Sequence, residues 1–191
     1  PTLLETAYRV VPGAPNFNPD LNAAKSRQVE LGYKARYAKT LLNAAVYTVD
    51  TDNEIVVRAA AGGVTSFQNA GRTQREGFEL GMQHQFNAQW RSNLALNLIN
   101  AEYKTSNNAI TAGNSLPSIP NRTVFAELLY KPNQSLETGA EYRHIGSFYA
   151  NDDNTAQVAS ANVWNWRISH TQKLNVPLFH ADIPGVERNP H

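Results

Sequence analysis

The chain has 191 residues, no cysteine and a balanced charge, with 17 Lys and Arg against 16 Asp and Glu. This length suits one domain, the balanced charge lacks the basic surface that nucleic acid requires, and the missing cysteine excludes disulfides and thiolate metal sites. No apolar run reaches the about 18 residues of a membrane-spanning helix, but the short, half-apolar strands of a membrane barrel remain possible.

The first 25 residues are rich in Pro, Asn and Ala and are predicted to form a loop. Beyond them, apolar and polar residues alternate with a period of two, which predicts strands with two unlike faces. The predicted strands are 28–37, 41–50, 77–86, 89–103, 122–130, 136–144 and 161–171. About seven strands and no convincing helix follow from these patterns.

The connections between the predicted strands alternate in length. Tight turns follow the first, third and fifth strands, whereas 51–66, 104–121 and 146–160 are long, polar and rich in Gly, Asn and Thr. Short turns at one end and long loops at the other are typical of an outer-membrane barrel. The fold class predicted is therefore all-β, an antiparallel up-and-down transmembrane β-barrel segment that is incomplete.

Aromatic residues occur where the predicted strands end. Tyr37, Phe86, Trp90 and Tyr130 lie beside the short turns, and Tyr103, Phe148, Tyr149, Trp164 and Trp166 lie toward the long loops. Two such girdles suit the headgroup layers of a membrane, although aromatic residues also favour strands in general. With this reading, Phe78, Leu80 and Met82 face lipid, and Glu79, Gln83 and Gln85 face a wet interior.

Four stretches resemble the TonB-dependent outer-membrane receptors. They are "NPDLNAAKSRQVELGYKARY", "FQNAGRTQREGFEL", "IPNRTVFAELLYKP" and "YANDDNTAQVASANVWNW", in the order that the family has them, over about 18–174. The resemblance implies the C-terminal part of a receptor barrel in the bacterial outer membrane. It also implies energised uptake of a ferric siderophore or a related metal chelate, with outer-membrane lipid and TonB as partners, the latter through a missing N-terminal part.

The chain departs from that family at its end. The last residues, "NVPLFHADIPGVERNPH", contain three prolines and no alternation, which is poor strand material. We therefore expect an extracellular loop over 1–25, a partial barrel over 26–174 and an atypical, irregular tail over 175–191. A piece of this kind, with the plug domain absent, is expected not to transport anything alone.

The resemblance implies that aromatic and basic side chains of the outer loops and upper lumen capture the ligand. The candidates are Arg58, Phe67, Arg72, Tyr103, Arg143, Phe148 and Tyr149. Arginine suits carboxylate or phosphate-like groups through bidentate hydrogen bonds. The plainer interpretation is that Arg143 and Arg91 pair with Glu141, Glu137 or Glu79 along the lumen wall.

No metal site, cofactor or enzymatic activity is predicted. The five histidines lack ligand spacing, and His84 and His144 fall on the predicted lipid face near strand ends. Residues 151–155, "NDDNT", lack the pattern of a calcium loop and are expected to be a solvated polar loop. Two alternatives remain at this point, a soluble β-sandwich binding module and a small outer-membrane barrel with another role, such as lipid hydrolysis.

Overall fold

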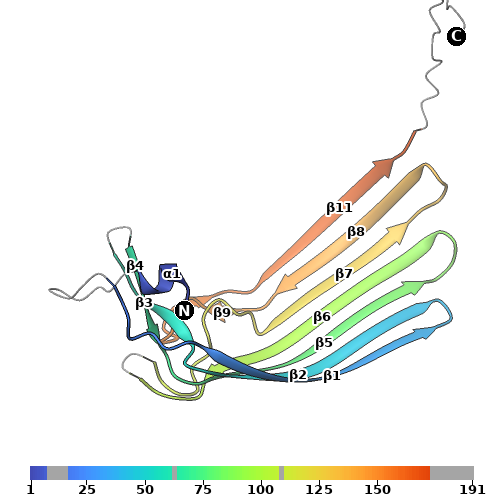
Figure 1. The fold of residues 1–191 in the computed structure, drawn as a ribbon. Coiled ribbons are helices and arrows are strands. Elements are labelled where there is room, and N and C mark those ends of the chain that lie inside the picture. Colours follow the sequence, from blue (N-terminus) through green and yellow to red (C-terminus); the bar gives the residue numbers. More distant parts are fainter. Residues whose placement is uncertain (8–16, 62–63, 108–109, 173–191) are drawn as a thin grey trace, which may run out of the picture.

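The computed structural model describes residues 1–7, 17–61, 64–107 and 110–172, and its regular structure is almost entirely antiparallel strand. Seven strands form one sheet in the order β1-β2-β5-β6-β7-β8-β11, with β1 and β11 as its two edges (Figure 1). They are β1 Lys25–Tyr37, β2 Thr40–Asp52, β5 Thr73–Gln85, β6 Trp90–Tyr103, β7 Arg122–Tyr130, β8 Leu136–Ile145 and β11 Ala161–His170. Across the described ranges the sheet does not close, which confirms the predicted antiparallel, incomplete seven-strand barrel segment.

The connections at the two ends of the sheet differ, as the sequence predicts. The short ones are 38–39, 86–89 and 131–135, and the long ones are 53–72, 104–121 and 146–160. Asn87 and Asn133 close the two longer turns, because their side-chain oxygens accept the backbone N–H groups of Trp90 and Leu136, each at 2.9 Å. We call this end the turn end, and the opposite end, where the long connections gather, the loop end (Figure 1).

The long connections contain regular structure that was not predicted. Strands β3 Ile55–Ala61 and β4 Val64–Asn69 form a hairpin, and β9 Phe148–Tyr149 pairs with β10 Gln157–Val158. Within the segment predicted to be a loop, α1, Leu3–Thr6, forms one helical turn closed by a capping box. Elements this short give no detectable periodicity, which is why the sequence patterns missed β9, β10 and α1.

No helix in the described ranges is long and apolar enough to cross a membrane. The predicted tail over 175–191 lies outside the described residues.

The strand register places alternate residues on two unlike faces. One face carries Glu30, Lys34, Asn43, Glu79, Asn97, Glu127, Glu141, Arg143 and Arg167. The other carries Val29, Leu31, Val46, Phe78, Leu80, Met82, Leu96, Leu98, Val124, Leu128, Tyr142, Trp164, Trp166 and Ile168. A cavity of about 820 Å³ extends along the polar face from β1 to β8, so this face is the concave one.

The apolar face is convex and uncovered. Val29, Leu31 and Tyr33 are 64%, 75% and 63% exposed, and so are Trp164 and Trp166 at 74% and 70%. A β-sandwich would cover these residues with a second sheet. In the part of the chain that the structure describes they stay open, so the sandwich alternative is wrong.

The apolar band on the convex face is tilted relative to the strands. Toward the loop end it finishes at Val29 on β1, at Phe78 on β5 and at Trp164 on β11. When both limits are followed through the register to β5, Val29 is level with Glu76 and Trp164 is level with Met82. The loop-end limit of the band therefore shifts by six residues along the strands over the six steps from β1 to β11. With about 3.3 Å per residue and about 4.8 Å between strands, this slope is about 35°. Strands of membrane barrels are tilted by about 35–45°, so the band would lie level in a membrane.

Aromatic residues border the band at the turn end as predicted. The rings of Trp90 and Tyr130 stack with centroids 4.4 Å apart, and Tyr37 and Phe86 are exposed. Toward the loop end the predicted girdle is wrong for Tyr103, because this side chain lies on the concave side and is fully buried. Its burial comes from Ile110 and Leu116 of the connection that follows β6 and from Ala70 before β5.

Candidate functional site

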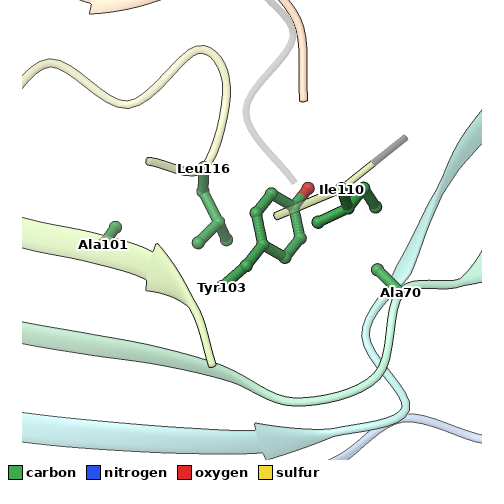
Figure 2. Close-up of a cluster of buried hydrophobic side chains, with 5 residues drawn as sticks. All are labelled: Ala70, Ala101, Tyr103, Ile110 and Leu116. Carbon is green, nitrogen blue, oxygen red and sulfur yellow. The ribbon is translucent and has the colours of Figure 1, made fainter. Parts of the chain in front are cut away.

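A small apolar core holds the loops to the sheet at the loop end. It consists of Ala70, Ala101, Tyr103, Ile110 and Leu116 (Figure 2), and we call it the cap core. Tyr103 is the last residue of β6 and lies in the middle of the cluster, with 0% of its surface exposed. Because Ile110 and Leu116 belong to the connection 104–121, their packing on Tyr103 fixes that loop above the sheet.

Residues 151–155 form hydrogen bonds with Tyr103 and with Ser115 of this loop. The Tyr103 hydroxyl donates to Asp152 Oδ1 at 2.5 Å. The Asn154 side chain forms two hydrogen bonds with the backbone of Ser115. Its Oδ1 accepts from the N–H at 2.7 Å, and its Nδ2 donates to the carbonyl at 2.9 Å. The prediction of a solvated polar loop is therefore wrong for Asp152 and Asn154, whose side chains hold two connections together.

A cavity of about 370 Å³ lies beside the cap core. Arg75 Nη1 and Glu54 Oε2 form an ion pair at 3.1 Å in its wall, and the Thr73 hydroxyl donates to the same carboxylate oxygen at 2.7 Å. Tyr103 also contributes to the lining. The cavity therefore offers aromatic, cationic and anionic groups within one small space.

A charged cluster crosses the concave face nearer the turn end. Glu127 of β7 and Glu141 of β8 are paired directly across the strands, an arrangement in which like charges destabilise a sheet. Arg167 of β11 compensates, with its Nη2 2.9 Å from Glu127 Oε1 and its Nη1 3.5 Å from Glu141 Oε1. Asn93 Nδ2 donates to Glu127 Oε2 at 2.6 Å. Arg167 is the cation that bridges both carboxylates, and it is not among the site residues predicted from the sequence.

Arg143 lies on the concave face in the lining of the large cavity. Its Nη2 is 3.5 Å from Glu141 Oε2, and its guanidinium carbon is 5.2 Å from the centre of the Phe125 ring. The plainer prediction, a pairing of Arg143 with Glu141, is confirmed, although the two residues are neighbours along β8 rather than across strands. For Arg91 no ion pair is found with any described carboxylate.

The other predicted ligand residues gather at the loop end. Arg58 is exposed on β3 where the pairing with β4 shifts its register, and Phe67 of β4 is half-buried. Arg72 precedes β5 and is 52% exposed, with its Nη2 2.8 Å from Asp50 Oδ1. That hydrogen bond, followed by the charge of Asp50, raises the pKa of the Arg72 guanidinium. Phe148 and Tyr149, both half-buried, form β9.

The predicted residues thus divide between two places. Arg143 lies on the concave wall, and Arg58, Phe67, Arg72, Tyr103, Phe148 and Tyr149 lie at the loop end. No group of three or more His, Asp or Glu side chains that could hold a metal occurs within the described ranges.

Gly71 supports the loop end through its backbone, and a variant tests this. Its φ is +85°, and a Cβ there would lie 2.1 Å from Thr105 Oγ1, the atom that accepts the Arg72 N–H. We expect Gly71→Ala to destabilise the complete barrel protein by more than the about 1 kcal/mol of left-handed strain alone. The control is Gly113→Ala, where φ is +93° but nothing lies within 4 Å. Equal shifts of the two variants in urea denaturation would contradict this packing.

The combined features define a section of membrane-barrel wall, with an apolar convex face, a polar concave face, short turns at one end and folded loops at the other. The chain belongs to the TonB-dependent receptor-like β-barrel family, whose model matches residues 1–179. Members of this family are outer-membrane β-barrels. The family is one of receptors and transporters and not an enzyme class.

Solved structures of receptor barrels have the same fold. The ferric yersiniabactin uptake receptor FyuA from Yersinia pestis is 22% identical, with a TM-score of 0.68 over 84% of this chain and 24% of its own. The copper transporter OprC is 19% identical, with a TM-score of 0.69 over 85% of this chain and 25% of its own. BauA, the ferric preacinetobactin receptor from Acinetobacter baumannii, is 15% identical, with a TM-score of 0.66 over 88% and 26%. The chain therefore spans about a quarter of the length of these proteins.

Proposed function

We propose that this chain is part of the barrel wall of an outer-membrane TonB-dependent transporter that takes up a ferric siderophore or a similar scarce nutrient. The observation that carries the proposal is the family match over 1–179. The level apolar band on the convex face supports a place in the membrane, with the strands crossing lipid and the concave face toward the lumen.

The proposed cargo is a metal chelate of several polar groups. FyuA and BauA are described as receptors for ferric chelates and OprC as a copper transporter, which favours this class. Arg58 and Arg72 present exposed guanidinium groups at the loop end, and such groups bind carboxylate or catecholate oxygens through charge-assisted bonds. Phe67 supplies an apolar contact.

Within this proposal the seven predicted residues have different tasks. Phe148 and Tyr149 lie on β9 beside the loop-end cavity and would contact the chelate. Arg143 faces the lumen and would act after capture, on the way inward. Tyr103 is buried under the loops, so it would support the ligand residues by holding the cap in place.

The proposal extends to partners and domain organisation. Outer-membrane lipid surrounds the convex face, and TonB supplies energy through a part of the receptor that precedes this barrel section. The division into a loop over 1–25, a barrel section over 26–174 and an irregular tail over 175–191 belongs to the same proposal. Sequencing the gene on both sides of the coding segment tests it, since plug-coding sequence upstream is expected.

Uptake measurements test the function directly. Deletion of the complete gene is expected to abolish uptake of one radiolabelled ferric chelate and growth on it as the sole iron source, while the plasmid-borne gene restores both. Deletion of TonB should have the same effect, because the transport is energised. Normal uptake of ferric catecholates, hydroxamates and citrate in the deletion strain, together with normal copper and cobalamin uptake, would contradict the proposal.

A further inference from the structure

We propose that Arg122, held in place by His144 and Asn162 on the convex face, binds the phosphate group of a membrane lipid headgroup. The inference rests on the proposed position of the barrel in a membrane. It adds a lipid site on the outer wall that is separate from the ligand residues of the loops and lumen.

The register places these three residues in the first polar row beyond the apolar band. Arg122 pairs with Leu98 of β6, and His144 pairs with Val124 of β7 on one side and with Asn162 of β11 on the other. Leu98 and Val124 are the last apolar convex residues of their strands before the loop end. The row therefore lies at the depth of the headgroups in the leaflet at the loop end.

A chain of hydrogen bonds fixes the orientation of the arginine. Arg122 Nε is 3.0 Å from His144 Nε2, and His144 Nδ1 is 2.8 Å from Asn162 Oδ1. Because guanidinium nitrogens only donate, His144 Nε2 is the acceptor, so the neutral ring carries its proton on Nδ1 and donates it to Asn162. The Tyr142 hydroxyl also donates to Asn162 Oδ1, at 2.8 Å.

The backbone of Arg122 is held as well. Its carbonyl accepts the N–H of Gly146 at 2.8 Å. A Cβ on Gly146 would come within 3.1 Å of Arg122 Cγ, so the missing side chain leaves room for the arginine stem. The side chain is thus positioned before any ligand arrives, which reduces the entropy lost on binding.

The two terminal nitrogens of Arg122 remain available. The residue is exposed, and no ion pair joins it to a carboxylate in the described ranges, whereas Arg72, Arg75, Arg143 and Arg167 each have at least one. A guanidinium next to an apolar surface, with its planar fork unoccupied, suits bidentate binding of a phosphate.

The surface beneath the arginine indicates a lipid rather than a free anion. The rings of Tyr142 and Trp164 lie one row nearer the turn end with centroids 4.6 Å apart, and Trp164 is 74% exposed. Below them the apolar band continues with Trp166 and Ile168, which are 70% and 69% exposed. A molecule with a phosphate at one end and acyl chains at the other would fill both surfaces at once.

The test measures which lipid occupies this surface. The complete encoded protein is reconstituted in vesicles of brominated phosphatidylcholine, which quench nearby tryptophan, and unbrominated phosphatidic acid is added. The signal lost in Trp164→Phe identifies the fluorescence of Trp164. Phosphatidic acid should relieve the quenching of Trp164. In Arg122→Gln the same relief should require an about tenfold higher fraction of phosphatidic acid in the vesicles, as expected for loss of one charge-assisted bond.

A matched variant and the quenching of Trp164 distinguish failure of the lipid site from failure of the transporter proposal. Arg91→Gln removes the same charge from the concave face and should behave as the unaltered protein, while heat-modifiable gel mobility verifies that each variant folds. An unchanged response in Arg122→Gln, or an equal loss in Arg91→Gln, would overturn the lipid site and leave the transporter proposal intact. Absence of any quenching of Trp164 by brominated lipid would overturn both, because the convex face would then not meet acyl chains.

Discussion

Replacement of Tyr103 by alanine is expected to release the loops from the sheet while the barrel strands stay paired. The ring is fully buried in the cap core, and truncation of a buried aromatic side chain costs about 3–5 kcal/mol. The loss falls on 104–121 and 146–160, whose packing on the sheet depends on this residue. In the complete barrel protein, trypsin should cleave after Lys104 and hydrogen exchange should accelerate at the Ser118 amide, which is bonded to the Tyr149 carbonyl in the intact cap.

Tyr103→Phe separates packing from hydrogen bonding. It keeps the ring and removes only the hydroxyl bond to Asp152, so a smaller loss of about 1–3 kcal/mol is expected. Strand amides, such as those of β5, should keep their protection in both variants. If the loops of Tyr103→Ala remained as protected as those of the unaltered protein, the cap core would not be what holds them.

Replacement of Arg167 by methionine is expected to weaken the sheet at its β7–β8–β11 side. It leaves Glu127, which is 6% exposed, and Glu141, which is 14% exposed, opposite each other without their shared cation. Breaking a buried pair costs about 3–5 kcal/mol, but Arg167 itself is 48% exposed, so about 1–3 kcal/mol is more realistic after solvent screening. Urea denaturation of the complete protein, followed by heat-modifiable gel mobility, measures the change.

Two comparisons show whether charge is the cause. The double variant Arg167→Met with Glu141→Gln removes the repulsion and should recover most of the lost stability, and Arg91→Met, which breaks no ion pair with a described carboxylate, should have little effect. If adding Glu141→Gln to Arg167→Met gave no recovery of stability, packing of the arginine stem would be the better explanation.

The main sheet could be predicted because its signals are local. In 77–86 the alternation of Phe78, Leu80 and Met82 with Glu79 and Gln83 assigns these residues to opposite faces wherever the strand lies, since the side-chain period of a strand is two. The lengths of the connections follow from the spacing of the predicted strands, and they predict the up-and-down strand order and the two unlike ends of the sheet. The β3–β4 hairpin is not predicted, although its Ile and Val residues favour strands, because the surrounding Gly and Asn indicate a loop.

The sequence by itself therefore determined the class of the protein, the antiparallel sheet and the division of its residues between a polar and an apolar face. The tertiary structure decided which polar residues meet. Tyr103 looks like a girdle residue until the connection 104–121 folds back over it and Asp152, 49 residues away, binds its hydroxyl. Arg167 pairs with Glu141, 26 residues away, only when β11 lies beside β8. Periodicity arises from neighbouring residues along one strand, whereas burial and ion pairing depend on how loops fold back and which strands lie side by side, and these distances are set only once the sheet has formed.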